Sequence, residues 1–175
     1  MGSIQLKRVI LPKSGVDMFY REQTTTDTAN VLVLLHGFPA SSHQYRNLIP
    51  LLATRYRVIA PDLPGFGFTQ APADFKYSFE TLTNTVSEFL DVLNIAKFAV
   101  YVFDYGAPVG YRLALQRPDA VQAIISQNGN AYIEGLGDVW APIKEFWVSD
   151  NTPEDRDKIA NYVSSILSFA IQSDS

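Results

Sequence analysis

The chain has 175 residues, 47% of them hydrophobic and 18% charged, with a formal net charge of −4. This length and composition are typical of a globular chain of about one domain and exclude an intrinsically disordered one. The mildly acidic balance argues against a phosphate-binding surface, so we expect no nucleic-acid partner. No apolar run reaches the roughly 20 residues of a membrane span, so we expect no membrane association.

The sequence has no cysteine and two histidines, His36 and His43. Disulfides, a thiol nucleophile and thiolate metal sites are therefore excluded, and two histidines cannot build a multi-histidine metal centre. We expect neither a metal nor a cofactor. The lack of cysteine fits a reducing compartment, and no signal-peptide core is seen at the amino end, so we expect a cytoplasmic protein. The peroxisome is the alternative if the true carboxyl terminus lies beyond Ser175.

The first three quarters of the chain predict a β-hairpin followed by alternating strands and helices. The hairpin is expected at 4–11 and 16–20, with Ser14-Gly15 as its turn. From residue 31 the expected order is β-α-β-α-β-α-β, with strands at 31–35, 56–60, 98–103 and 121–126 and helices at 41–54, 79–93 and 109–116. This order predicts an α/β fold: a mostly parallel sheet with an N-terminal hairpin and helices on both faces.

From Asn128 onward the alternation ends. The residues that follow include the aromatic side chains Tyr132, Trp140, Phe146 and Trp147. Thr152 and Pro153 predict the start of a helix, with an apolar stripe over 159–171. Trp140, Phe146 and Trp147 are interpreted either as pocket-lining residues or as ordinary core.

Asp104 lies between the expected strand 98–103 and the helix that follows, among small residues. A strand, a sharp turn and a helix form the arrangement that displays a nucleophile at the carboxyl end of a parallel sheet, where ligands bind in open α/β folds. Gly106 permits the tight turn, and the helix dipole favours an ionised carboxylate. The alternative is that Asp104 only caps the helix. We predict the nucleophile position.

The segment His36-Gly37-Phe38-Pro39 follows the first buried strand. Gly37 lets the backbone turn sharply, so the backbone N–H of Phe38 can point into the same pocket as that of Tyr105. Two such donors would form an oxyanion hole. His36 itself is interpreted as structural, bonded to nearby backbone. His43 is interpreted as a solvated helix residue, with the rim of a pocket as the alternative.

Asp62 ends a neighbouring strand and precedes Gly65 and Gly67. We interpret its carboxylate as the group that holds this loop by bonding backbone N–H groups. The two glycines alone are a weak indication of phosphate binding, because no Gly-Lys-Ser/Thr follows.

Three motifs in this order carry a family resemblance: 31–39, 60–67 and 103–106. Together they resemble the α/β-hydrolase fold, and most closely its aspartate-nucleophile branch, which includes epoxide hydrolases and haloalkane dehalogenases. His36-Gly37-Phe38-Pro39 is closer to the epoxide-hydrolase pattern, and Tyr105 stands where these enzymes usually carry Trp. The resemblance implies a partial hydrolase core over 1–127 and the beginning of a lid over 128–175.

The resemblance also implies a two-step reaction on a small electrophilic substrate, for which an epoxide is the first choice and a halide or ester the alternatives. Asp104 would form an alkyl ester, and the N–H groups of Phe38 and Tyr105 would hold the oxyanion while a histidine-activated water cleaves the ester. Lid tyrosines often protonate the epoxide oxygen, and Tyr132 and Tyr162 are candidates that no motif separates.

In the family the catalytic acid and histidine follow the lid, and no histidine follows Asp104 here. General-base assistance is worth about 10²–10⁴-fold, so we expect a truncated chain with little independent turnover. The alternatives are a non-catalytic binding protein or pseudoenzyme, and a second polypeptide that supplies the missing half. Without further strands, 121–126 would form an exposed apolar edge through which we expect self-association.

Overall fold

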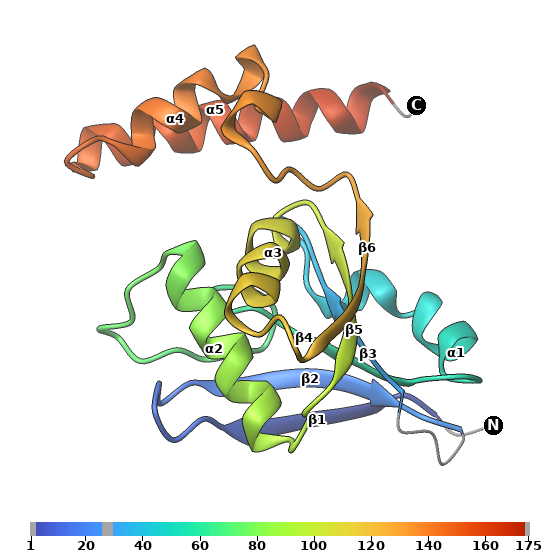
Figure 1. The fold of residues 1–175 in the computed structure, drawn as a ribbon. Coiled ribbons are helices and arrows are strands. Elements are labelled where there is room, and N and C mark those ends of the chain that lie inside the picture. Colours follow the sequence, from blue (N-terminus) through green and yellow to red (C-terminus); the bar gives the residue numbers. More distant parts are fainter. Residues whose placement is uncertain (1–2, 26–29, 174–175) are drawn as a thin grey trace. The chain divides into compact units, whose positions relative to one another are not determined.

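The computed structural model describes residues 3–25 and 30–173, and contacts divide the chain into two units, 1–131 and 132–175 (Figure 1). In the described part of the chain, no helix combines the length and the apolar character that crossing a membrane requires.

The first unit is built on a six-stranded sheet of order β1-β2-β4-β3-β5-β6. β1 pairs with β2, and β2 with β4, in antiparallel fashion, whereas β3 pairs in parallel with both β4 and β5, and β5 with β6. This confirms the predicted sheet and its N-terminal hairpin. The strands are β1 Gln5–Ile10, β2 Asp17–Gln23, β3 Val31–Leu35, β4 Arg57–Pro61, β5 Phe98–Phe103 and β6 Val121–Gln127.

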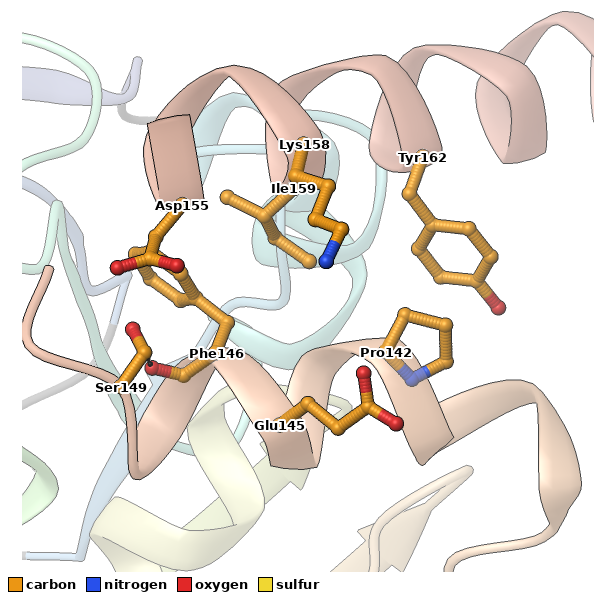
Figure 2. A pocket seen from close by; sticks show the side chains of 8 residues that line it. All are labelled: Pro142, Glu145, Phe146, Ser149, Asp155, Lys158, Ile159 and Tyr162. Atoms are coloured by element: carbon orange, nitrogen blue, oxygen red, sulfur yellow. Dashed lines mark hydrogen bonds between the residues drawn. The ribbon is translucent and has the colours of Figure 1, made fainter. Parts of the chain in front are cut away.

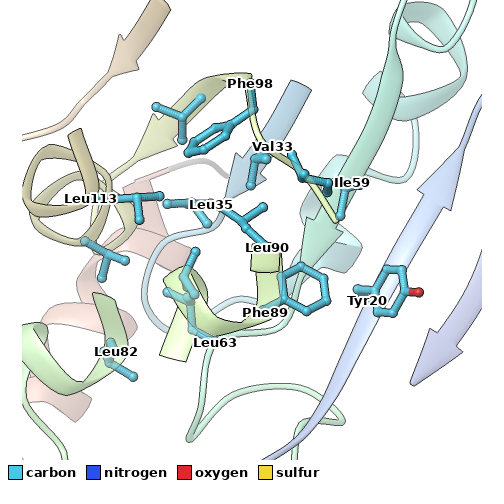
Figure 3. Close-up of a cluster of buried hydrophobic side chains, with 14 of the residues drawn as sticks. Tyr20, Val33, Leu35, Ile59, Leu63, Leu82, Phe89, Leu90, Phe98 and Leu113 are labelled. Carbon is cyan, nitrogen blue, oxygen red and sulfur yellow. The ribbon is translucent and has the colours of Figure 1, made fainter. Parts of the chain in front are cut away.

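β3 lies in the interior of the sheet, and all five of its residues are buried. Side chains alternate between the two faces of a strand, so Val31, Val33 and Leu35 join one hydrophobic cluster while Leu32 and Leu34 join another. Helices α2 Phe79–Val92 and α3 Gly106–Gln116 pack on the first cluster, part of which is drawn in Figure 3. The short helix α1 Leu48–Leu52 packs on the second. Helices therefore cover both faces, as predicted.

The helix expected at 41–54 is wrong as a single element. The structure has a 3-10 helix, η1 Ser42–Tyr45, followed by α1. Pro50 explains the interruption: it lacks the N–H that a continuous helix would bond to the Arg46 carbonyl, and its ring would clash with that carbonyl. Pro50 is accommodated because α1 restarts at Leu48 and places it in the first turn.

The second unit contains η2 Ile133–Gly135, η3 Asp138–Trp140, α4 Ala141–Trp147 and α5 Pro153–Ser173. The predicted start of α5 is confirmed. The backbone N–H of Asp155 donates to the Thr152 hydroxyl at 3.2 Å, and the Asp155 carboxylate accepts from the Thr152 N–H at 3.0 Å, as in a capping box. The Thr152 N–H, and then the Thr152 hydroxyl, which donates to the Asp155 carboxylate at 2.8 Å, lower the pKa of Asp155. Of the predicted apolar stripe, the side chains of 166–171 lie outside the described residues.

Candidate active site

Asp104 occupies the sharp turn between β5 and α3. Its φ of +48° lies in the left-handed region, which few residues other than glycine adopt. The turn and the start of α3 pack closely against β3 and β5. A Cβ on Gly106 would lie 2.4 Å from the Leu35 carbonyl oxygen, and a Cβ on Gly110 would lie 2.3 Å from the Val102 side chain. Glycines at these two positions let α3 start directly against the sheet. The local geometry is that of a residue displayed at the end of a strand.

The Asp104 carboxylate meets the loop that follows β3. The backbone N–H of Phe38 donates to Asp104 Oδ1 at 2.8 Å. Gly37 makes this approach possible, because a Cβ there would lie 2.7 Å from the Cβ of Asp104. The capping alternative loses its basis, since the N-cap of α3 is Tyr105 and no side-chain bond caps this helix. The structure thus brings together two of the three predicted site residues through a hydrogen bond.

Tyr105, the third predicted site residue, follows Asp104 directly. As the N-cap of α3, its backbone N–H belongs to the amino-terminal donors that find no partner within the helix. Its ring lies 4.7 Å from that of Phe79 and 5.6 Å from that of Phe66, and the Phe66 ring lies 6.1 Å from that of Phe38. Burial, and then the nearby Asp104 carboxylate, raise the pKa of the Tyr105 hydroxyl. The rings of Tyr105, Phe79, Phe66 and Phe38 thus form a connected cluster, the aromatic wall, which begins at the residue next to Asp104.

Sequence reasoning missed Phe66 and Phe79 as members of this wall. Phe66 lies in the loop after β4, and Phe79 begins α2. The position of the Phe66 loop at the carboxyl end of a strand was a usable signal, because that edge of a parallel sheet is where ligands bind. For Phe79 no local pattern pointed to the site.

His36 is fully buried and has both ring nitrogens in hydrogen bonds with backbone. The Leu63 N–H donates to Nε2 at 2.9 Å, and Nδ1 lies 2.9 Å from the Gly37 carbonyl oxygen. Burial lowers the pKa of His36, against the opposing effects of the Gly37 carbonyl, Asp62 and Asp104. The structural interpretation of His36 is confirmed. His43 is exposed in η1, which agrees with its interpretation as a solvated residue.

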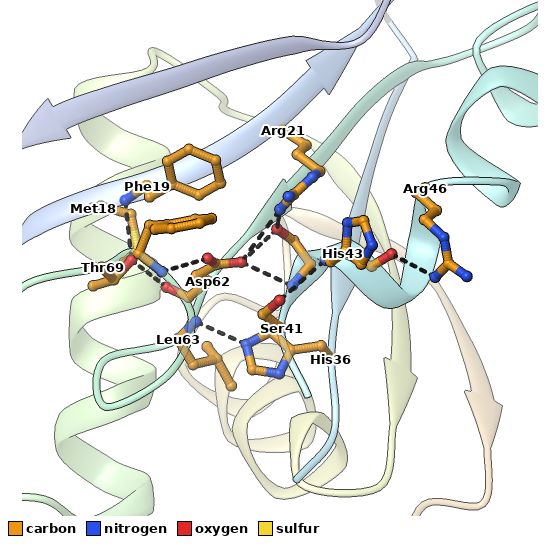
Figure 4. Close-up of polar contacts among 12 residues, drawn as sticks. Met18, Phe19, Arg21, His36, Ser41, His43, Arg46, Asp62, Leu63 and Thr69 are labelled. Carbon is orange, nitrogen blue, oxygen red and sulfur yellow. Dashed lines mark hydrogen bonds and ion pairs between the residues drawn. The ribbon is translucent and has the colours of Figure 1, made fainter. Parts of the chain in front are cut away.

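Asp62 is fully buried at the end of β4 and accepts several hydrogen bonds (Figure 4). The backbone N–H groups of Ser42 and Phe68 each donate at 2.8 Å, the Ser42 hydroxyl also donates, and Arg21 lies 3.8 Å away as an ion-pair partner. Gly67 is required beside it, because a Cβ there would lie 1.9 Å from Asp62 Oδ2. Asp62 thus ties two loops together, which confirms its predicted structural role.

The second unit contains a pocket of about 320 Å³ between α4 and α5 (Figure 2). Phe146, one of the aromatic candidates, lines it, as does Tyr162. The full lining consists of Pro142, Glu145, Phe146, Ser149, Asp155, Lys158, Ile159 and Tyr162.

The other aromatic candidates of the second unit do not line this pocket. Trp140 and Trp147 lie with ring centroids 6.1 Å apart, and Trp147 is half-exposed. Tyr132 is largely exposed, and the Tyr162 hydroxyl donates to the Val139 carbonyl. The assignment of 128–175 as the beginning of a lid stays a prediction, and so does the role of Tyr132 or Tyr162 as a proton donor.

Comparison with known proteins places this geometry in a family. A family model described as the alpha/beta hydrolase fold matches residues 30–160. An uncharacterized hydrolase from Saccharomyces cerevisiae is 54% identical over 138 residues, which are 78% of this chain and 47% of that protein.

Two solved structures show the same likeness. An epoxide hydrolase from Vigna radiata has a TM-score of 0.65 and 32% identity, over 72% of this chain and 40% of that one. A haloalkane dehalogenase from Bradyrhizobium elkani has a TM-score of 0.66 and 33% identity, over 73% of this chain and 42% of that one. The chain thus spans less than half the length of each of these three proteins. Because the family model covers most of its residues and the sheet has the matching architecture, the chain belongs to the α/β-hydrolase fold family.

Proposed function

We propose that this chain supplies the nucleophile of a hydrolase for small electrophilic substrates and forms an ester on Asp104. One observation carries the proposal: Asp104 lies in a left-handed turn at the end of β5, and one of its carboxylate oxygens accepts the Phe38 N–H at 2.8 Å. A carboxylate held in this way has a fixed orientation and keeps its second oxygen for attack.

In the first step, Oδ2 of Asp104 attacks a carbon of the epoxide. A new C–O bond forms, the carbon–oxygen bond of the ring breaks, and its electron pair stays on the epoxide oxygen, which takes a proton from solvent water. The ester carbonyl oxygen is then Oδ1, already bonded to the Phe38 N–H. Water attack on this ester would place negative charge on Oδ1, where the Phe38 and Tyr105 N–H groups stabilise it.

The second step needs a base for the attacking water. His36 does not serve as this base, because both of its ring nitrogens are in hydrogen bonds with backbone. The residues around Asp104 therefore support ester formation more strongly than ester hydrolysis. An ester that persists is the expected product when this chain meets a reactive substrate.

An epoxide with an aromatic or aliphatic substituent is the proposed substrate class. The aromatic wall beside Asp104, formed by Phe38, Phe66, Phe79 and Tyr105, offers an apolar surface to such a substituent. Tyr105 stands where the family resemblance places a tryptophan that supports halide binding. An epoxide is therefore favoured over a haloalkane, which is the second candidate.

Intact-mass spectrometry after incubation with styrene oxide tests the proposal. We expect a mass increase of one probe molecule, located on Asp104 by peptide mapping. The variant Asp104→Asn should remain unmodified, and Asp74→Asn, at an exposed aspartate, should be modified like the wild type. An unmodified wild-type mass with both styrene oxide and a haloalkane at saturating concentration would contradict the proposal.

A second candidate function is strand-mediated association, and β6 favours it. β6 forms one edge of the sheet, its residues 122–127 are exposed, and it contains no charge and no proline. At the opposite edge, Lys7 and Arg8 of β1 form ion pairs with Glu22 and Asp17. Edge strands without charge or proline pair readily with other strands. We propose that β6 of one copy pairs with β6 of a second.

Sedimentation velocity over a range of concentrations tests this association. A concentration-dependent dimer is expected for the wild type and should be lost in Ile125→Lys, which puts a charge on β6. Ile10→Lys makes the same change on β1 and is the matched control, because Ile10 is also exposed on an edge strand. A monomer at every concentration would contradict the proposed pairing.

A further inference from the structure

The peptide between Gly37 and Phe38 has hydrogen bonds at both of its ends. Its N–H, which belongs to Phe38, donates to Asp104 Oδ1 at 2.8 Å. Its carbonyl, which belongs to Gly37, lies 2.9 Å from His36 Nδ1 and accepts the Ala40 N–H at 3.0 Å. The peptide is trans, so its N–H and C=O point in opposite directions within one plane. Whatever fixes the direction of the Gly37 carbonyl therefore also fixes the direction of the Phe38 N–H.

The tautomer of His36 follows from its second hydrogen bond. A backbone N–H can only donate, so the Leu63 N–H makes Nε2 an acceptor. The proton of the neutral ring is then on Nδ1, which donates to the Gly37 carbonyl. Leu63 directly follows Asp62, and the Asp62 carboxylate is itself held by Ser42 and Phe68. A rigid loop thus determines which nitrogen of His36 carries the proton.

We propose that His36 is a positioning residue that orients the Phe38 N–H toward Asp104 through the opposite end of the same peptide. The inference rests on the proposed function, in which the Phe38 N–H binds Oδ1 of Asp104 and of the ester. His36 touches neither the substrate nor the Asp104 carboxylate in this arrangement. It acts only through the Gly37 carbonyl, and its ring remains neutral with Nδ1 protonated.

Two substitutions separate this role from a purely structural one. The side-chain amide nitrogen of Asn in His36→Asn is bonded to Cγ, as Nδ1 is, so it can still donate to the Gly37 carbonyl but cannot reach Leu63. The amide group of Gln in His36→Gln lies near the place of Nε2, so it can accept from Leu63 but leaves the Gly37 carbonyl without this donor. Each variant keeps one of the two bonds in a buried site, so comparable losses of stability are expected.

The test measures the rate of Asp104 ester formation with styrene oxide and the amide signal of Phe38 in ¹H–¹⁵N NMR spectra. We expect His36→Gln to form the ester about 10-fold more slowly or worse, because the Asp104 carboxylate loses its fixed orientation and a misplacement of about 1 Å can cost about 10²-fold. His36→Asn should stay within about 3-fold of the wild type. The Phe38 amide proton should move upfield in His36→Gln and remain near its wild-type position in His36→Asn.

Equal ester rates and equal Phe38 signals in the two variants would overturn the proposal while leaving the function of Asp104 intact. Failure of the wild type to form any ester would instead contradict the proposed function, and the Phe38 signals would still decide the positioning role. If either variant does not fold, ¹⁵N NMR of His36 in the wild type decides. A protonated Nδ1 and an unprotonated Nε2 are expected, and the reverse tautomer or a charged ring would overturn the proposal.

Discussion

Asp62 and Asp104 end the two strands that flank β3, so both lie at the carboxyl edge of the sheet, yet their surroundings differ. Asp62 is fully buried, and its two oxygens accept bonds from two backbone N–H groups and a hydroxyl, with Arg21 close by. Asp104 is partly exposed and accepts one bond from Phe38. A carboxylate with both oxygens engaged stabilises its loops, whereas one that keeps an oxygen available can attack a substrate.

The substitution Asp104→Asn should give the largest effect in this comparison. Ester formation should be lost completely, because an uncharged amide oxygen is a very poor nucleophile. The free energy of unfolding should change by no more than about 0.5 kcal/mol, since Asn tolerates a positive φ and its amide oxygen can still accept the Phe38 N–H. Mass spectrometry and urea denaturation together measure both expectations. A large loss of stability would show that Asp104 is a structural residue like Asp62.

The same substitution at the other strand end, Asp62→Asn, should act on stability. Arg21 would lose its buried partner, and breaking a buried ion pair by removing one member costs about 3–5 kcal/mol. Urea denaturation should therefore show a large fall in the free energy of unfolding, in contrast to Asp104→Asn. A change below about 1 kcal/mol would mean that the network around Asp62 contributes little to stability.

Gly67→Ala should disturb the Asp62 network from the opposite side. The added methyl would meet the Asp62 carboxylate, and Gly67 has a φ of +54°. The combined cost of backbone strain and overpacking is about 2–4 kcal/mol. Gly137→Ala is the matched control, because a Cβ at that glycine would have no neighbour within 4 Å. Thermal unfolding of the two variants measures the difference, and equal midpoints would contradict the packing argument.

The contrast between the two aspartates could be predicted from the sequence only in part. The strand–turn–helix pattern around Asp104 and the Gly-containing loop after Asp62 are local, and the predicted turn geometry and the predicted structural role of Asp62 agree with the structure, whereas the nucleophile role of Asp104 stays a prediction. Arg21 was not predicted as the partner of Asp62, because the pairing of β2 with β4 depends on strand order, which the local pattern does not encode. The break at Pro50 was visible in the sequence, but the helical spacing of the neighbouring apolar residues outweighed it in the prediction.

The aromatic wall was also beyond local reasoning. Phe38, Phe66 and Phe79 come from three separate segments, and only the folded sheet brings them to Tyr105. A motif can indicate which residue is displayed at the end of a strand, because the backbone geometry of the turn is encoded within a few positions. The residues that surround it are selected by long-range packing.

The smallest predicted effect concerns His36. Its ring bonds the N–H of Leu63, the residue after Asp62, and the carbonyl of Gly37, whose peptide N–H binds Asp104. Burial lowers the pKa of His36 in the folded state, whereas the unfolded chain has the ordinary value of about 6.5. As the pH falls through this value, the unfolded state binds a proton first, so the free energy of unfolding decreases below about pH 6.5 and is fully retained above it. One such group contributes a slope of at most about 1.4 kcal/mol per pH unit.

Urea denaturation between pH 7.5 and 5.5 measures this slope, and His36→Asn should flatten it because it removes the titrating ring. Asp62 and Asp104 both favour the charged ring and oppose the effect of burial. Glu22 provides a second acid-sensitive contribution at lower pH: burial alone would raise its pKa, but its hydrogen bonds with Lys7 and Arg57 lower it. The stability that Glu22 contributes is therefore lost only below about pH 4.5, outside the measured window.

Equal slopes in the wild type and His36→Asn would mean that the buried ring accepts a proton without cost. That result would contradict the hydrogen bond from the Leu63 N–H to Nε2, because a protonated Nε2 has no lone pair with which to accept it.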